Sequence, residues 1–421
     1  MKKFFLILVC ILNLNAADAT MEVVNRGQTL PKIIVQNVNS DFSDNATNSK
    51  MSKILIGDLK VIASFEVVGN LDFSNGNHNT DLVKSSKADF VLQYWMSNQN
   101  GGLFLNTKLI STKNSNIKFD RSFNETDTAK WPFLAHKAIK SVIKDLNLPS
   151  VDWLDKYILI AQYTSPGKSN IMIADYTLNY TKNVITGGLN IFPKWANNNY
   201  SAFYYTTYTQ NTMPTLYRFD LNTGKKTRLL SSTGMIVASD VSKDGNKLLL
   251  TMAPEEQSDI YLYDTRTRHL TKITNYKGID TNGNFVDNER GVVFISDRLG
   301  YPNIFRTDIN GGDIEQMVDH SRNNNSVTTF GNYVVYASRE HSGEYSEKTF
   351  NLYLISTKSS YIRQLTINGV NTFPRFSRDG GSIIYIKNLS NQRSAVGIIR
   401  LNENKSFQFP LRIGKLQSID W

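Results

Sequence analysis

The histidines and paired acids of this sequence are the side chains best suited to acid–base or metal chemistry. The five histidines are His78, His136, His269, His320 and His341. Only His320 and His341 lie within one sequence repeat, whereas a metal site needs several ligands that converge. His136 lies on an apolar helix and is interpreted as a packed or interface residue rather than a base. Glu255 and Glu256 fall in a predicted loop and are interpreted as solvated charge.

Motifs of nucleophilic and phosphate chemistry are absent. A serine peptidase that carries a propeller would show Gly-x-Ser-x-Gly, which this chain lacks. No Gly-rich loop precedes a predicted helix, so no phosphate cradle is expected. Cys10, the only cysteine, falls in the N-terminal segment discussed next, so the mature chain has no disulfide, thiol or Cys metal site. We therefore expect no catalytic residue, no cofactor and no metal.

The N-terminus has the three parts of a secretory signal peptide. Lys2 and Lys3 form a positive start, and Phe4–Leu12 is an apolar stretch too short to span a bilayer. The small residues of Ala17-Asp18-Ala19 predict cleavage after Ala19, with Ala16 as the alternative. Residues 1–19 are thus expected to be removed and the mature protein to be exported. A buried N-terminal helix is the alternative reading.

The charge distribution argues against nucleic acid as a partner. The formal charge of +10 is spread along 421 residues without a run of five basic side chains. Dispersed charge is typical of a basic surface, whereas nucleic-acid sites cluster their cations. No other segment approaches 18 consecutive apolar residues, so we expect no direct membrane insertion.

Residues 20–150 mix helical and strand patterns, which predicts a small α/β domain that begins with an N-terminal arm. The predicted strands are Ile33–Val35, Asp89–Tyr94 and Leu103–Ile110. The clearest helix is Pro132–Asn147, where apolar residues recur every four positions from Leu134 to Leu146. Asn48–Asp58 shows weaker helical spacing.

A repeat replaces the helical period after residue 150. The pattern apolar-aromatic-x-x-Asp ends at Asp175, Asp220, Asp264 and Asp308, with counterparts at Ser356 and Arg400, and successive ends lie 44 to 48 residues apart. Every unit contains several short strands and no helix. Six units of this period predict that residues 151–421 form an all-β, six-bladed β-propeller.

Two Pro-x-aromatic segments, in Asn190–Thr206 and Asn371–Ile386, are interpreted as the innermost strands of blades. Proline is tolerated at the start of a strand, and the aromatic is expected to pack between neighbouring sheets. A ligand surface built on these segments is the alternative. The first unit, near Tyr157, lacks such a segment, so we expect Leu416–Trp421 to pair with the first blade and close the ring.

The complete order resembles the TolB family, the periplasmic propeller proteins of the Tol–Pal system in Gram-negative envelopes. The resemblance rests on an Ala135–Ile139 helix followed directly by six repeats with Pro-x-aromatic and Asp-Gly turns. The Ser-Pro-Asp-Gly turn of the family survives in altered form at Ser242–Gly245 and Ser377–Gly380. It is lost at 197–199 and 287–289.

The resemblance implies a protein that is not an enzyme. It implies a monomeric periplasmic adaptor that binds the lipoprotein Pal through the propeller and TolA through the N-terminal arm, and so supports outer-membrane integrity and cell division. Other outer-membrane lipoproteins or porins are further candidate partners. A glycan-binding propeller or a relic of a propeller-bearing hydrolase remains the alternative, although Tyr204, Tyr205, Tyr261 and Tyr263 alternate as sheet faces do.

Two sets of site residues follow from the same resemblance. The TolA-binding arm is carried over as Thr20, Met21, Glu22, Val23, Val24 and Asn25, which could add as a strand to a partner's sheet. The alternative is a disordered leftover of cleavage. The Pal-facing loops are carried over as Leu189, Asn190, Ile191, Val237, Ala238, Asp280, Thr281, Asn282, Asn371 and Thr372. Here the alternative is that the Asn and Thr side chains only satisfy turn backbones.

Overall fold

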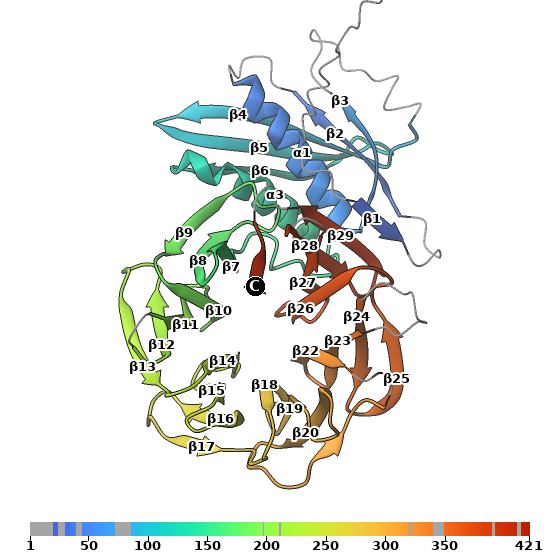
Figure 1. Ribbon diagram of the computed structural model, residues 1–421. Coiled ribbons are helices and arrows are strands. Elements are labelled where there is room, and N and C mark those ends of the chain that lie inside the picture. Colours follow the sequence, from blue (N-terminus) through green and yellow to red (C-terminus); the bar gives the residue numbers. More distant parts are fainter. Residues whose placement is uncertain are drawn as a thin grey trace, which may run out of the picture.

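A small α/β unit and a ring of β-sheets make up the computed structural model of the chain (Figure 1). It describes residues 20–23, 30–38, 44–71, 86–196, 198–209, 212–319, 321, 323–339, 349–389, 392–410 and 414–421. The expected signal peptide, residues 1–19, lies outside the described residues. Within the described part of the chain, no helix has the length and apolarity that a membrane crossing requires.

The α/β unit is a five-stranded sheet in the order β3-β2-β4-β5-β6 with two helices packed on it. Its strands are β2 (Lys32–Asn37), β3 (Glu66–Leu71), β4 (Phe90–Gln99), β5 (Gly102–Ser111) and β6 (Ile117–Glu125). Its helices are α1 (Asn45–Ile62) and α3 (Trp131–Asp145), with the 3₁₀ turn η1 (Thr128–Lys130) before α3. The predicted strands and helices of this region are therefore confirmed.

Local sequence signals explain both helices. The carboxylate of Asp44 accepts a hydrogen bond from the backbone N–H of Thr47 and caps α1, which ends where Ala63 takes a left-handed φ of 57°. In α3, Pro132 stands in the first turn, where its missing N–H breaks no bond. The apolar stripe of α3 is buried against the sheet and α1.

Six blades, each with four antiparallel strands, surround the axis of the ring, as the repeat predicted (Figure 1). Single parallel pairs, Leu189 with Ser169 and Phe350 with Val370, join neighbouring blades. Blade 1 contains β30 (Leu416–Asp420), β7 (Ile158–Ser165), β8 (Lys168–Ala174) and β9 (Thr181–Ile185). Blade 2 contains β10 (Leu189–Trp195), β11 (Ala202–Tyr208), β12 (Thr215–Asp220) and β13 (Lys226–Ser231). Blade 3 contains β14 (Ile236–Val241), β15 (Lys247–Met252), β16 (Asp259–Asp264) and β17 (Leu270–Lys272).

The remaining blades repeat this order, with the first strand innermost. Blade 4 contains β18 (Asp280–Val286), β19 (Gly291–Ser296), β20 (Asn303–Asp308) and β21 (Glu315–Gln316). Blade 5 contains β22 (Asn324–Phe330), β23 (Tyr333–Arg339), β24 (Phe350–Ser356) and β25 (Ser359–Gln364). Blade 6 contains β26 (Val370–Phe376), β27 (Ser382–Asn388), β28 (Ser394–Arg400) and β29 (Lys405–Pro410).

The two Pro-x-aromatic segments are the innermost strands β10 and β26. Trp195 is buried between blades 1 and 2 with Phe203 and Tyr205, and the ring of Phe376 lies 5.9 Å from that of Phe330 in blade 5. The aromatic of each segment thus packs between sheets, as predicted. Each of the six innermost strands also carries a register shift, and such a bulge re-aims the side chains that follow it.

The C-terminal strand pairs with the first strand of the propeller, as the sequence predicted. Ile419 pairs with Ile160 and Asp420 with Leu159 in an antiparallel ladder, so blade 1 contains strands from both ends of the repeat region. Trp421 is only 4% exposed, and its ring centroid lies 4.9 Å from that of Trp153, in the segment that leads into the propeller. The chain end is therefore held by the ladder and by aromatic packing.

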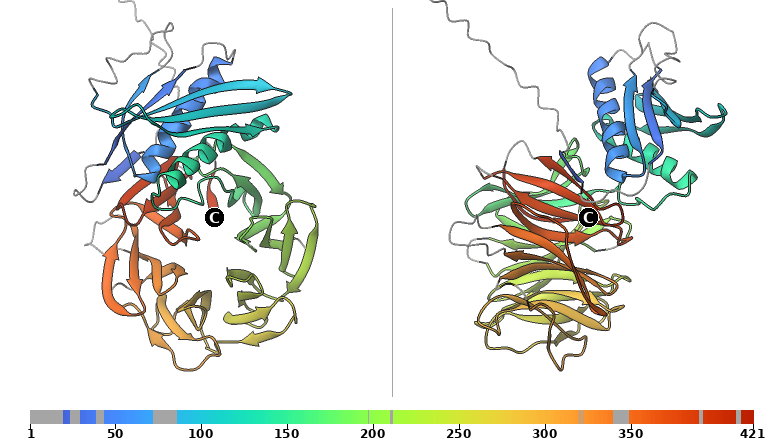
Figure 2. Two further views of the ribbon diagram at one scale, coloured as in Figure 1. Left: turned by 180° about the vertical axis from the view of Figure 1, so that it is seen from behind. Right: turned by 90° about the vertical axis from the view of Figure 1, so that its right-hand side faces the viewer.

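One hydrophobic cluster runs through both parts of the molecule. It joins α1, α3 and the N-terminal sheet to buried residues of blades 1 and 6, including Ile398, Phe407 and Trp421. The right-hand view of Figure 2 shows the α/β unit beside the rim of the propeller at these blades. A shared core of this kind holds two units as one body more firmly than a polar interface would.

Truncation of Trp421 tests the anchoring of the chain end. Trp421→Ala is expected to lower the free energy of unfolding by about 3–5 kcal/mol, because a buried aromatic is replaced by a cavity. Ile367→Ala is the matched control, since Ile367 is 61% exposed and surface truncations change stability by about 0.5 kcal/mol or less. Urea unfolding of both variants measures the difference. Equal effects would show that Trp421 does not anchor the strand.

Candidate functional site

The propeller presents two different faces to a partner. We call top face the side formed by the loops that lead into the innermost strands and by the loops between second and third strands. The bottom face is formed by the turns that leave the innermost strands, such as Ser242–Gly245 and Ser377–Gly380. The ten residues that the sequence analysis assigned to loops lie instead in the first halves of the innermost strands β10, β14, β18 and β26, at or near the top face.

Most of these ten side chains are not available to a partner. Buried are Asn190, Ile191, Val237, Ala238, Asp280 and Asn371, whereas Leu189, Thr281, Asn282 and Thr372 are half-buried. Only these four half-buried side chains of the predicted set could contact a partner directly, together with the backbone of the loops.

Hydrogen bonds explain why the loop asparagines are buried. Asn190 donates through Nδ2 to the carbonyls of Ser169 (3.1 Å) and Gly187 (2.8 Å). Asn371 donates to the carbonyls of Phe350 (2.9 Å) and Asn368 (2.8 Å) in the equivalent place. Both amides satisfy backbone groups where one blade passes into the next, which is the role that the alternative interpretation gave them.

Exposed apolar side chains on the top face were missed by the sequence reasoning. They are Tyr163 (38% exposed), Met213 (55%), Ile279 (53%), Leu299 (43%) and Ile367 (61%). Tyr163 lies near the end of β7 in blade 1, and the other four stand in loops of blades 2, 4 and 6, so they are spread around the face. The sequence signal that could have found them is a large apolar residue close to Gly, Asn or Pro in a predicted loop. Among the described residues of the propeller, Ile314, Tyr333, Tyr361 and Ile362 are also exposed but lie away from the top face. Exposed apolar groups that share a face are typical of protein-docking surfaces.

Two aromatic rings stand where the innermost strands begin. Phe192 of β10 and Phe373 of β26 are half-buried, with ring centroids 6.1 Å apart. Both occupy bulges with a left-handed φ of 51°, which is unusual for a bulky residue. Backbone strain of this kind persists only where the surroundings hold it, and it is often found at functional sites.

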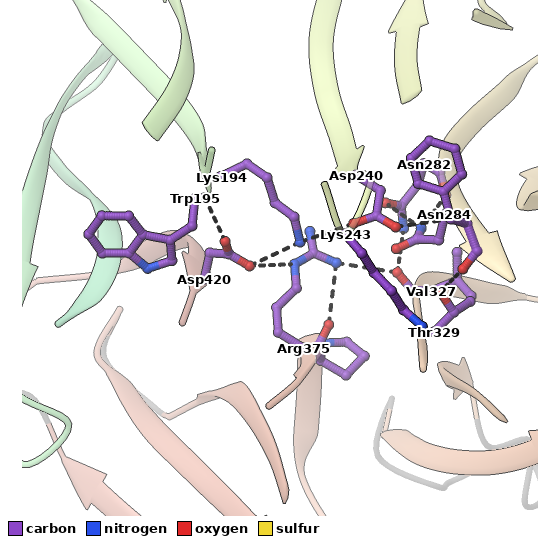
Figure 3. A network of polar contacts seen from close by, with 12 residues as sticks. Lys194, Trp195, Asp240, Lys243, Asn282, Asn284, Val327, Thr329, Arg375 and Asp420 are labelled. Carbon is purple, nitrogen blue, oxygen red and sulfur yellow. Dashed lines mark hydrogen bonds and ion pairs between the residues drawn. The ribbon is translucent and has the colours of Figure 1, made fainter. Parts of the chain in front are cut away.

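Four ionised side chains meet in the central channel (Figure 3). Asp420 of β30 lies between two cations, with Lys194 Nζ at 3.1 Å and Arg375 Nε at 3.8 Å from its Oδ1. Lys194 also lies 3.6 Å from Asp240 Oδ1. The two cations are the middle residues of the Pro-x-aromatic segments. The sequence analysis explained the aromatic of that motif and missed the channel-facing residue.

A cavity of about 330 Å³ lies between this charged cluster and the bottom-face turns. Its rim includes Lys243, Glu289 and Arg378, and aromatic residues such as Phe285 and Phe330 line its walls. No group of three or more metal-ligating side chains gathers anywhere in the described ranges. The polar chemistry of the channel is therefore ion pairing and hydrogen bonding.

The first residues of the N-terminal arm form the strand β1 (Thr20–Val23). β1 pairs antiparallel with β29, the outer strand of blade 6, with Thr20 opposite Gln408 and Val23 opposite Lys405. Val24 and Asn25 lie outside the described residues. The arm thus adds a strand to a sheet edge of its own propeller, which is the mode of binding that the sequence analysis expected it to use with a partner.

His136 is buried where the α/β unit meets blade 1. Its Nδ1 lies 2.8 Å from Asp58 Oδ2 of α1, and its Nε2 lies 3.3 Å from Asp175 Oδ2, directly after β8. Tyr176 donates its hydroxyl proton to the other oxygen of Asp58. All three partners of the ion pairs are fully buried. The sequence interpretation of His136 as an interface residue is confirmed.

The electrostatics of this cluster keep His136 charged. Burial alone disfavours the imidazolium, but the carboxylates of Asp58 and Asp175 outweigh it and raise the pKa of His136 to about 10. Burial also raises the pKa of Asp58, and the imidazolium opposes that shift. Both imidazole nitrogens therefore carry protons and donate to carboxylates, so this histidine has no free nitrogen to act as a base.

Comparison with known proteins gives a consistent result. The family model described as "TolB beta propeller domain" matches residues 156–393. The Tol-Pal system protein TolB of Wolinella succinogenes is 45% identical over 417 residues, which cover 97% of both chains. That of Campylobacter jejuni is 49% identical over 423 residues and all of both chains. The crystal structure of TolB from Acinetobacter baumannii shares the fold, with a TM-score of 0.73 at 19% identity over 96% of this chain and 99% of that one.

The charge on His136 predicts a pH dependence of stability. The folded-state pKa of about 10 exceeds the unfolded value of about 6.5. The stabilisation is therefore complete below pH 6.5 and is lost as pH rises through 10. His136→Gln is expected to lose this dependence, so that the gap between wild type and variant in free energy of unfolding narrows from pH 6 to pH 10. Urea unfolding across this range measures the gap. A constant gap would contradict a buried imidazolium.

Proposed function

The chain belongs to the TolB family of the Tol-Pal system, and on that basis we propose that it is a non-enzymatic adaptor in the periplasm. In this proposal residues 1–19 are a cleaved signal, residues 20–150 form an α/β domain with the N-terminal arm, and residues 151–421 form the propeller. The adaptor connects partners of the outer and the inner membrane and so supports envelope integrity and division. The observation that carries the proposal is the rigid propeller with exposed apolar residues on its top face.

The proposed ligand of the top face is the lipoprotein Pal. Met213, Ile279, Leu299 and Ile367 offer apolar contacts around the face, and the half-buried Leu189 and Thr281 lie nearer to its centre. The buried asparagines hold the loops in place and so contribute preorganisation rather than contact. A rigid face of this kind binds without the entropic cost of ordering loops.

The proposed ligand of the arm is TolA. An extended segment that adds to its own β29 through backbone hydrogen bonds is also able to add to the sheet edge of another protein. β1 uses one of its two hydrogen-bonding edges on β29. In this proposal TolA pairs with that same edge, so its binding requires β1 to leave β29. Partner binding by the arm therefore competes with its docking on blade 6.

Charge substitution on the top face tests the docking proposal. Ile279→Asp combined with Leu299→Asp is expected to weaken binding of Pal at least about tenfold, because two apolar contacts become buried charges. Ile314→Asp is the control, since Ile314 is 38% exposed in a bottom-face loop. Pull-down from periplasm, followed by titration with the purified lipoprotein, measures binding. If the double variant recovers Pal as fully as the control does, the top face does not bind this partner. The same conclusion follows if the protein retains only oligosaccharide.

Deletion of residues 20–31 tests the role of the arm. We expect recovery of the inner-membrane partner to be abolished and recovery of the outer-membrane lipoprotein to be unchanged, because β1 pairs with the outer edge of blade 6 and not with the innermost strands of the top face. Pull-down with each purified partner gives the two readings separately. Loss of both partners would show that the deletion damages the propeller. Retention of both partners would show that the arm is not the binding site for TolA.

A further inference from the structure

The cavity of the bottom face lies on the side of the channel that the proposed docking leaves unused. Its volume of about 330 Å³ suits a small ligand or the end of a chain. The walls mix aromatic side chains such as Phe285 and Phe330 with polar ones such as Thr328 and Ser377. The floor is the cluster of Lys194, Asp240, Arg375 and Asp420 (Figure 3). Charged groups that converge on a concave site fix the orientation of a ligand.

The carboxylates of the floor already have their hydrogen-bond donors. Asp420 Oδ2 accepts the backbone N–H of Trp195 at 2.8 Å, and Oδ1 faces Lys194 Nζ. Asp240 Oδ2 accepts the backbone N–H of Phe285 at 3.0 Å. These bonds occupy the carboxylates with partners of the propeller itself, so they leave little for a ligand that donates protons.

Arg375, by contrast, has only long contacts to the acceptors around it. Its Nη1 donates to the carbonyls of Val327 and Pro374, each at 3.3 Å. Its buried Nε faces Asp420 Oδ1 at 3.8 Å, an ion pair that is too long for a hydrogen bond. The residue nevertheless lines the cavity, so its guanidinium is the cation of the floor best placed to attract an acceptor from outside.

The rim adds a net positive charge, since Lys243 and Arg378 outnumber Glu289 there. The backbone N–H of Lys243 donates to Glu289 Oε1 at 2.6 Å, which fixes the turn of blade 3 against that of blade 4. The side chain of Lys243 is exposed, and within the described part of the chain it makes no hydrogen bond or ion pair. A cation fixed at the mouth of a cavity attracts anions toward the floor.

We propose that this cavity binds a carboxylate, carried by a small organic acid or by the C-terminus of a peptide, with Arg375 as the principal ligand. A singly charged group fits better than a phosphate, because Asp240 and Asp420 would repel a second negative charge. The planar guanidinium matches the geometry of a carboxylate. The site is separate from the top face, so it would remain accessible when a partner occupies that face.

Calorimetric titration of the full-length mature chain at low ionic strength tests the proposal. The small-acid probe is N-acetylalanine with its amide as control, and the peptide probe is N-acetyl-Gly-Gly-Ala with its C-terminal amide. Each acid that binds is expected to do so at least about tenfold more tightly than its amide, because the amide cannot form the charge-assisted pair with Arg375. If both acids bind, a small organic acid is a sufficient ligand. If only the peptide acid binds, the ligand is the C-terminus of a peptide. Inorganic phosphate is expected to bind more weakly than the acid.

Three variants locate the site. Arg375→Gln is expected to lower the affinity for the acid at least about tenfold, and Lys243→Gln about threefold, since Lys243 acts from the rim. Arg228→Gln, on the exposed outer strand β13, is the control and should change nothing. If Arg375→Gln melts at a lower temperature than the wild type, its loss of affinity could reflect unfolding. The affinity of Lys243→Gln for the acid then decides whether the cavity is the binding site. The proposal would be overturned if acid and amide bound equally well, or if neither bound at millimolar concentration. It would also be overturned if phosphate bound more tightly than the acid, or if Lys243→Gln left the affinity for the acid unchanged.

Discussion

The pairing of β30 with β7 is the constraint on which the remainder of the structure depends. Each blade buries its faces against two neighbours, so the first and last blades of a propeller would expose an edge and a face if the chain ends did not meet. Here the last five strand residues form the innermost strand of blade 1. Trp421 stacks near Trp153, and Asp420 is held by cations from blades 2 and 6.

The same junction fixes the α/β unit on the propeller. Trp421 and Phe407 belong to a buried cluster that continues into α1 and α3, and the ion pairs of His136 cross the boundary within it. A buried imidazolium between two carboxylates is costly to separate, because each charge would lose its partner in a medium of low dielectric constant. The α/β unit and the propeller faces therefore keep a defined relation to one another.

The two faces of the propeller divide the chemistry of the molecule. The top face combines exposed apolar side chains with loops held from within by asparagine side chains, an arrangement that favours contact with a folded protein. The bottom face opens into a cavity with a charged floor, which favours a small or slender ligand. In β10 and β26 a bulge lies between these regions, after Ile191 and Thr372 and before the cations Lys194 and Arg375.

The sequence by itself determined the number of blades and the main elements, although it did not mark β3 and β6 of the α/β unit. Helical spacing located α3, the 44 to 48 residue repeat gave six blades, and Pro-x-aromatic marked β10 and β26, because these patterns are local in the chain. Only the tertiary structure decided which side chains meet. Asp420 and Lys194 are 226 residues apart, and Asp58 and His136 are 78 apart. It also decided that Asn190 and Asn371 face inward while Ile279 and Leu299 face solvent, because burial depends on neighbouring blades that no local pattern records.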